Sequence, residues 1–165
     1  MTSDTHGVLG TDERASTVRF ERRYPTTADD LWAALTEPGR AGRWLGALHG
    51  DLRTGGRFEL RMGEDVPGTD QNAVGEVVAC DPPRAFTVTW AFPGEPETRV
   101  DVELRPDGDD VVLVLLHSGL TPTAARGYGG GWHASLDLLD DAVAGRPVRS
   151  WEAAFEAALP AYREG

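Results

Sequence analysis

A long amphipathic helix that follows a block of strands is the feature that most constrains the fold of this chain. Between residues 132 and 143, the apolar side chains of Trp132, Leu136, Leu139 and Val143 recur at helical spacing, which predicts a helix with one buried face. The large apolar surface available to that face is the run of alternating strands before it. A long helix across a curved sheet tends to enclose a pocket, so the sequence predicts a binding pocket more strongly than a reaction.

Alternation of apolar and polar side chains predicts a series of antiparallel strands. The predicted strands cover residues 18–24, 57–62, 74–80, 86–92, 100–105 and 111–118. In the third strand we expect Val74, Glu76, Val78 and Cys80 to share one face. The last strand, VVLVLLHS, is apolar on both sides, which indicates a central or doubly covered position. A hairpin turn, PDGD, precedes it.

Helix signals occur after the first strand and at the end of the chain. Thr26 or Thr27 can cap a helix with the sequence DDLWAALT, and a short second helix follows it. Thr121 and Pro122 mark the start of the long helix, as N-cap and first helical residue, and Gly145-Arg146-Pro147 marks its end. Because helices are confined to these two places and the strands are joined by hairpins, the sequence predicts an α+β architecture.

Glycines near the start of the long helix have two interpretations. Gly127 and Gly129 to Gly131 each disfavour a helix by roughly 1 kcal/mol relative to alanine. They indicate either a loop or kink that delays the helix until about Gly131, or space for a ligand or for close contact with the sheet. The sequence leaves both interpretations open.

Composition limits the classes of partner and location. The 165 residues suffice for one domain, expected over residues 16–165 after a flexible polar leader at residues 1–15. With no long apolar run and no secretory signal, we expect a cytoplasmic protein without membrane insertion. The 27 acidic and 16 basic side chains give a net charge of −11, which disfavours nucleic acid as a partner.

Several phrases in a fixed order resemble a known superfamily. They are TTADDLWAALTEPGRAGRWLG, GGRFELR, GEVVACDPPRAFTVTW, VVLVLLHSGL and GWHASLDLLDDAVAG, and they extend over most of residues 17–145. The chain is similar to START-like (SRPBCC) proteins, in the branch of the activator of heat-shock-protein-90 ATPase. The resemblance implies a helix-grip fold, in which a curved antiparallel sheet wraps a long C-terminal helix around an apolar cavity. The superfamily includes lipid and hormone carriers and polyketide aromatase/cyclases.

An additional amphipathic helix is predicted at residues 150–163, beyond the part that resembles the superfamily. Its apolar face is expected to use Trp151, Phe155 and Leu159. This helix could cap the cavity, cover the VVLVLLHS strand or form a subunit contact in a homodimer. The sequence does not choose among the three.

A set of mostly aromatic residues is expected to line the predicted cavity. The candidate ligand-binding residues are Trp44, Phe58, Met62, Phe86, Trp90, His117, Trp132 and Leu136. Ordinary core packing is the alternative interpretation for most of them. His117 and His133 could contact a ligand or act as a general base, although buried histidines more often have a structural role.

No motif for catalysis, metal or cofactor stands out. The histidines lack the spacing of a helical zinc site, and a single cysteine, Cys80, excludes an internal disulfide and a cysteine-built metal site. We expect Cys80 to act as a small buried apolar residue, and we expect neither a metal nor a cofactor. The leading hypothesis is therefore binding of a hydrophobic or aromatic small molecule. The alternatives are an enzyme of aromatase/cyclase type with His117 as its base, and a chaperone-interacting module.

Overall fold

The computed structural model describes residues 7–11, 15–62, 66–69 and 71–163. In this part of the chain, eight strands form one antiparallel sheet in the spatial order β1-β2-β8-β7-β6-β5-β4-β3. The strands are β1 (Val8–Thr11), β2 (Ser16–Tyr24), β3 (Ala47–Gly50), β4 (Arg57–Arg61), β5 (Asn72–Asp81), β6 (Ala85–Trp90), β7 (Thr98–Asp107) and β8 (Asp110–Leu120). The helices are α1 (Ala28–Thr36), α2 (Pro38–Ala41), α3 (Pro122–Ala144), α4 (Trp151–Ala158) and α5 (Pro160–Arg163).

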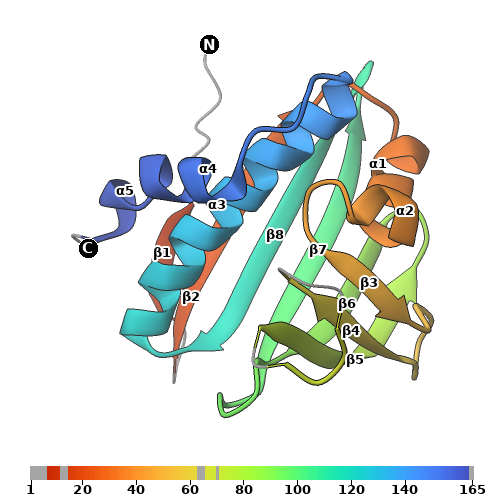
Figure 1. Cartoon of the computed structure of the whole chain (residues 1–165). Helices are drawn as coiled ribbons and strands as arrows, with labels where there is room; N and C mark the ends of the chain where they lie inside the picture. The colour runs from red at the N-terminus through yellow and green to blue at the C-terminus, as the bar shows by residue number, and fades with distance from the viewer. Residues whose placement is uncertain (1–6, 12–14, 63–65, 70, 164–165) are drawn as a thin grey trace.

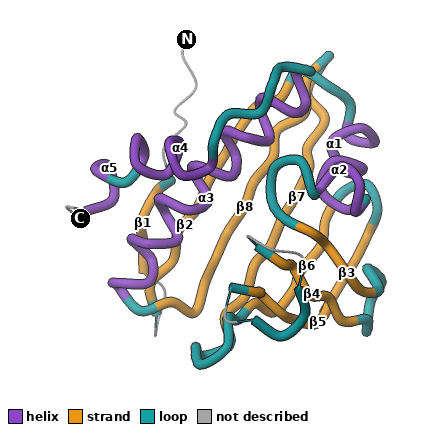
Figure 2. The backbone as a smooth tube through the Cα atoms, viewed as in Figure 1, coloured by secondary structure: helices purple, strands orange, loops and turns teal. Residues whose placement is uncertain are grey.

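Helix α3 crosses the sheet on the side of β1, β2 and β8 (Figure 1). Helices α1 and α2 lie at the other end of the sheet, near β3, and α4 and α5 lie beside α3 (Figure 2). A curved antiparallel sheet that holds a long C-terminal helix is the predicted α+β helix-grip fold, and the prediction is confirmed. Within the described residues, no helix is both long and apolar enough to cross a membrane.

The long helix begins and ends at the predicted signals. Thr121 caps α3 by accepting the backbone N–H of Ala124 on its hydroxyl at 3.1 Å. Gly145 ends the helix in the left-handed conformation, with φ of 72°, which glycine adopts without a steric penalty. The face that carries Trp132 and Leu136 is buried against the sheet, as the spacing predicts.

Of the two interpretations of the glycines, the loop or kink that delays the helix is wrong, because α3 is helical from Pro122 onward. A Cβ atom at Gly129 would lie 2.6 Å from the ring of Tyr162, and one at Gly130 would lie 3.1 Å from the ring of Phe155. The close contact that these glycines permit is therefore with α4 and α5 and not with the sheet.

The close packing of α4 and α5 on α3 also determines which of their residues are buried. The buried residues are Ala154, Ala158 and Tyr162, whereas Trp151 is 40% exposed and was expected to belong to the buried face. Small alanine side chains permit two helices to approach closely. The partly exposed Trp151 also contacts α3, because its indole N–H donates to the hydroxyl of Ser135 at 3.1 Å.

Two further expectations differ from the structure. The leader expected at residues 1–15 includes strand β1, whose apolar Leu9 pairs with Val18 of the otherwise open edge of β2; residues 1–6 and 12–14 lie outside the described part. In β5, Val78 is 47% exposed although Cys80 faces inward. The reason is a bulge between Val77 and Ala79, since an extra residue reverses the alternation of the strand.

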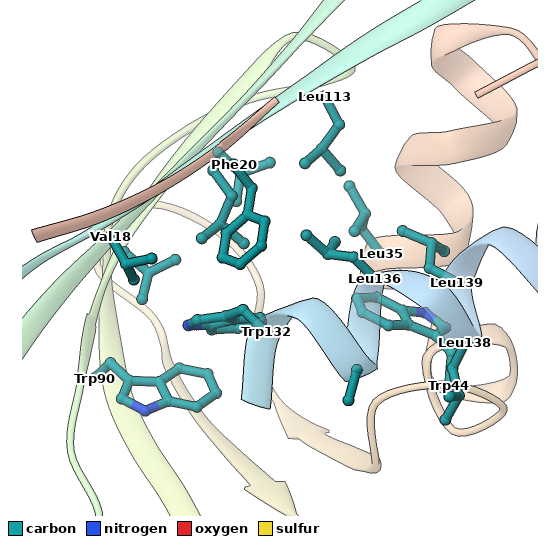
Figure 3. Packing of buried hydrophobic residues seen from close by; sticks show 14 of the residues in the cluster. Val18, Phe20, Leu35, Trp44, Trp90, Leu113, Trp132, Leu136, Leu138 and Leu139 are labelled. Carbon is teal, nitrogen blue, oxygen red and sulfur yellow. The ribbon is translucent and has the colours of Figure 1, made fainter. Parts of the chain in front are cut away.

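One core joins the sheet, α1 and α3. Figure 3 shows Phe20 and Leu113 from the sheet on one side of this core and Leu136 from α3 on the other, with Trp90 and Trp132 next to each other. Arg22, on the buried face of β2, is only 6% exposed and donates a 2.9 Å hydrogen bond to the carboxylate of Asp137 on α3. An ion pair therefore adds to the apolar contacts that hold α3 on the sheet.

Candidate binding cleft and inner cavity

The space between the sheet and α3 contains a small apolar cavity, which we call the inner cavity. Its volume is about 90 Å³. It is lined by Leu35, Thr36, Trp44, Leu45, Leu48, Leu52, Phe58, Leu60, Val77, Cys80, Phe86, Val88, Trp90, Val100, Val102, Leu113, Leu115, Trp132 and Leu136. Because a cavity of roughly 150 Å³ is known to hold a benzene ring, this space does not admit an aromatic ligand unless side chains move.

Beside the inner cavity lies a wider, open cleft of about 1040 Å³, which we call the outer cleft. Its described lining residues are Gly42, Arg43, Trp44, Leu45, Gly46, Met62, Gln71, Trp90, Phe92, Glu95, Ala124, Gly127, Tyr128, Gly131, Trp132, Ser135, Leu138, Ser150, Trp151, Glu152 and Phe155. Four residues border both spaces: Trp44, Leu45, Trp90 and Trp132. These shared side chains form the boundary between the outer cleft and the inner cavity.

Three tryptophans at this boundary come from three different parts of the chain. Trp90 ends β6, Trp132 lies on α3, and Trp44 follows α2. The ring centroids of Trp90 and Trp132 are 5.3 Å apart, and the Trp44 indole N–H donates to the carbonyl of Ala34 at 2.8 Å. The indole rings are thus fixed by contacts with the fold and present apolar surface to both spaces.

The eight predicted ligand-binding residues separate into four groups in the structure. Trp44, Trp90 and Trp132 border both spaces, and Phe58, Phe86 and Leu136 line the inner cavity alone. Met62 lines the outer cleft and not the inner cavity. His117 lines neither space, because it is completely buried behind the aromatic side chains.

His117 has hydrogen-bond partners on both ring nitrogens. The Trp132 indole N–H donates to its Nδ1 at 3.0 Å, which places the proton of the neutral ring on Nε2. That proton is donated to the hydroxyl of Thr98 at 2.7 Å, and the hydroxyl in turn donates to the carbonyl of Trp90 at 2.7 Å. Burial lowers the pKa of His117 to about 3, so a structural role fits this residue better than that of a general base.

His133 also makes structural contacts. It is buried on the other side of α3, where its Nδ1 lies 2.8 Å from the hydroxyl of Tyr162 and its Nε2 lies 3.5 Å from the carboxylate of Asp137. The hydroxyl of Tyr162 also accepts the backbone N–H of Gly7 at 2.7 Å. His133 therefore helps to join α3 to α5 and to the N-terminal segment, and it does not line the outer cleft.

Four aromatic residues outside the predicted ligand-binding set also line the outer cleft. Phe92 and Tyr128 stack with their ring planes 21° apart, and Trp151 and Phe155 stack with theirs 9° apart. Tyr128 could have been found from the sequence, because it precedes Trp132 by one helical turn and shares its face. Trp151 and Phe155 were expected on a C-terminal helix that could cap the cavity. The sequence could not choose this role over the other two, because it depends on how α4 folds back onto α3.

The hydroxyl of Tyr128 interacts with other polar side-chain groups at the outer cleft. It accepts the indole N–H of Trp90 at 3.2 Å. Burial raises the pKa of Tyr128 to about 12, and the neighbouring Glu95 carboxylate acts in the same direction. Tyr128 therefore stays protonated at neutral pH and can donate a hydrogen bond. Among the described residues, no group of three or more His, Cys, Asp and Glu side chains is placed to hold a metal ion.

Residues 25–144 match the family described as Activator of Hsp90 ATPase homolog 1-like protein. The chain belongs to this family. The predicted place in the START-like superfamily is thereby confirmed, and the match extends from the end of β2 to the end of α3. No curated protein matches the sequence.

Solved structures of similar proteins agree with this assignment. CalU16 from Micromonospora echinospora is 29% identical, with a TM-score of 0.79 and coverage of 95% of this chain and 94% of that one. The protein encoded by BPP1335 from Bordetella parapertussis is also 29% identical, with a TM-score of 0.74 and coverage of 99% and 95%. DynU16, from the dynemicin biosynthetic locus, is 25% identical, with a TM-score of 0.68 over 81% of this chain and 49% of its own.

Proposed function

We propose that this protein binds an aromatic or otherwise hydrophobic small molecule in the outer cleft, with an apolar end directed at the inner cavity. The observation that carries the proposal is the boundary between the two spaces, where the rings of Trp44, Trp90 and Trp132 border both. Concave sites lined by aromatic side chains with few polar groups are typical of small-molecule binding. The similarity to DynU16, a protein of a biosynthetic locus, supports a role with a small molecule.

The sizes of the two spaces support a position of the ligand mainly in the outer cleft. The outer cleft is large enough for a multi-ring compound, whereas the inner cavity accepts only a small apolar group. Burial of about 200 Å² of apolar ligand surface would contribute on the order of 5 kcal/mol. Lost translational freedom offsets part of this gain, so polar contacts at the outer cleft have to add to the affinity.

An enzyme of aromatase/cyclase type acting on a polyketide-like substrate is the second candidate. The structure favours Tyr128 over His117 as its proton-carrying group, because the Tyr128 hydroxyl lines the outer cleft next to Glu95. The protonated phenol could donate to a developing oxyanion on a bound substrate. Retained turnover of such a substrate in Tyr128→Phe would remove Tyr128 from that role.

A chaperone-interacting role is the third candidate, and its support is the name of the family. Stimulation of a chaperone ATPase by the purified protein would be its direct test. A cytoplasmic location and a homodimer both stay predictions. Analytical ultracentrifugation would decide the second of these.

A substitution that fills the outer cleft tests the binding proposal. A Cβ at Gly131 meets nothing closer than 3.9 Å, so Gly131→Leu extends a side chain into the outer cleft and also favours the helix. The matched control is Ala153→Leu, at an exposed position of α4 that does not line the outer cleft. Binding would be measured by tryptophan fluorescence and thermal shift with uncharged aromatic compounds, among them 9-anthracenemethanol.

We expect wild type and Ala153→Leu to bind with equal affinity, and we expect Gly131→Leu to lose at least about tenfold in affinity, since a tenfold loss corresponds to about 1.4 kcal/mol. If Gly131→Leu binds as well as wild type, the outer cleft is not the site. If the wild type binds none of the aromatic compounds, the proposal itself is wrong.

A further inference from the structure

The charged side chains of the outer cleft are unevenly distributed. Its described lining residues include one cation, Arg43, and two carboxylates, Glu95 and Glu152. All three are exposed. Arg43 follows α2, Glu95 lies in the connection from β6 to β7, and Glu152 lies on α4. The carboxylates of Glu95 and Glu152 therefore lie in different parts of the chain from the guanidinium of Arg43.

Glu95 and Glu152 lack the arginine partners that acidic residues on the outer surface of β7 have. On the outer surface of β7, Asp101 and Glu103 each pair with an arginine two residues away, at 3.1 and 2.9 Å. Within the described residues, neither Glu95 nor Glu152 has an arginine within salt-bridge distance. The negative charge of these two side chains is therefore available to a ligand in the outer cleft.

Glu95 is held next to the aromatic residues of the outer cleft. Its backbone N–H donates to the carbonyl of Phe92 at 3.0 Å, which fixes the turn that carries it. Its carboxylate helps to raise the pKa of the Tyr128 phenol, whose hydroxyl accepts the indole N–H of Trp90 at 3.2 Å. Glu95 therefore lines the outer cleft together with aromatic side chains. A carboxylate and aromatic rings in one cleft suit an ammonium group, because the faces of aromatic rings attract cations.

From these observations we infer that the ligand of the outer cleft is an aromatic amine, whose rings lie against Trp90 and Trp132 and whose ammonium group pairs with the carboxylate of Glu95. The inference rests on the proposed function and specifies the class of its ligand. The net charge of −11 supports it further, because the field of the protein attracts cations to its surface.

Three probes with the same ring system and different charge test the inference. 9-(Aminomethyl)anthracene is a cation at neutral pH, 9-anthracenemethanol is neutral, and anthracene-9-carboxylate is an anion. The dissociation constant of each is measured by fluorescence titration at low and at high salt. We expect the amine to bind about fivefold more tightly than the alcohol and the carboxylate to bind more weakly than both, with the difference reduced at high salt, as for an exposed ion pair.

Variants then assign the preference to Glu95. Glu95→Gln keeps the size and hydrogen-bonding capacity of the side chain and removes its charge, so it should lower the affinity for the amine to about the affinity for the alcohol. Glu103→Gln is the matched control, because it removes the same charge from the outer surface of β7. This control should keep the preference for the amine.

Each outcome separates this inference from the proposed function. If the wild type binds amine and alcohol equally, the ligand class is wrong and the binding site stands. If Glu95→Gln keeps the full preference, Glu95 is not the counter-charge and the inference is overturned. If none of the three probes binds, the proposed binding function fails together with the inference.

Discussion

The indole N–H of Trp132 on α3 donates a 3.0 Å hydrogen bond to Nδ1 of His117 on β8. This contact fixes the orientation of the indole ring that borders both the outer cleft and the inner cavity. It also joins the helix to the centre of the sheet through a buried polar pair. His117, which the sequence suggested as a ligand contact or base, thus lies one layer behind the outer cleft and holds an aromatic side chain of its wall in place.

The pH dependence of stability should reveal the buried His117. Its pKa is about 3 in the folded protein and ordinarily 6.5, so between these values the unfolded state binds more protons than the folded state. The stabilisation is therefore complete above pH 6.5 and decreases as the pH falls towards 3. Urea unfolding at pH 7 and pH 5 should show a decrease of at most about 1.4 kcal/mol per pH unit from this group.

A variant isolates the contribution of His117 from that of the carboxylates. His117→Gln is less stable at pH 7 by about 1–3 kcal/mol, because the Trp132 indole and the Thr98 hydroxyl lose well-placed partners in a buried site. It should also lose less stability than wild type between pH 6.5 and 5. Equal slopes in the two proteins would show that His117 is not buried in its neutral form.

Two Gly→Ala substitutions on α3 should have opposite effects on stability. A Cβ at Gly127 meets nothing within 4 Å, so Gly127→Ala should stabilise the protein by about 1 kcal/mol through helix propensity. A Cβ at Gly129 would lie 2.6 Å from the buried ring of Tyr162, so Gly129→Ala should destabilise it by about 1–3 kcal/mol through overpacking. Chemical denaturation measures both. Stabilisation by Gly129→Ala would contradict the close packing of α3 on α5.

Asp140 and Asp141, near the end of α3, allow the effects of removing an exposed and a buried carboxylate to be compared. Asp141 has a side chain only 5% exposed and accepts hydrogen bonds from the guanidinium groups of Arg146 and Arg149, which hold the pKa of its carboxyl well below its usual range. Asp140 is 45% exposed and contacts Arg146 alone. We expect Asp141→Asn to destabilise the protein by about 2–3 kcal/mol, and Asp140→Asn by less than about 1 kcal/mol. Thermal unfolding of both variants gives the comparison, and equal effects would contradict a buried role for Asp141.

Local signals predicted most of the elements. Thr27 was one of two candidates for the cap of α1 and accepts the backbone N–H of Asp30 at 3.1 Å. Thr121 and Gly145 mark the ends of α3 in both sequence and structure. These predictions succeed because capping and alternation depend on residues close in sequence. The resemblance of the ordered phrases to START-like proteins added the helix-grip arrangement and the apolar cavity.

Other features depend on contacts between distant segments and could not be predicted in this way. The bulge in β5 exposes Val78 because it alters the register with β6. The glycines of α3 serve helix–helix contact, which becomes visible only when Tyr162 is placed against Gly129. Phe155 reaches the outer cleft because α4 folds back onto α3.

The sequence alone predicted six of the eight described strands, the positions of the helices and the inward face of α3, and it missed β1 and β3. These properties follow from hydrophobic periodicity and from residue type. The tertiary structure decided that the inner cavity is small, that the larger space is the outer cleft, and that His117 is bonded to Trp132 and lines neither space. Volume and hydrogen-bond partners depend on how side chains from separate elements fill a shared space, and no local pattern in the sequence encodes that.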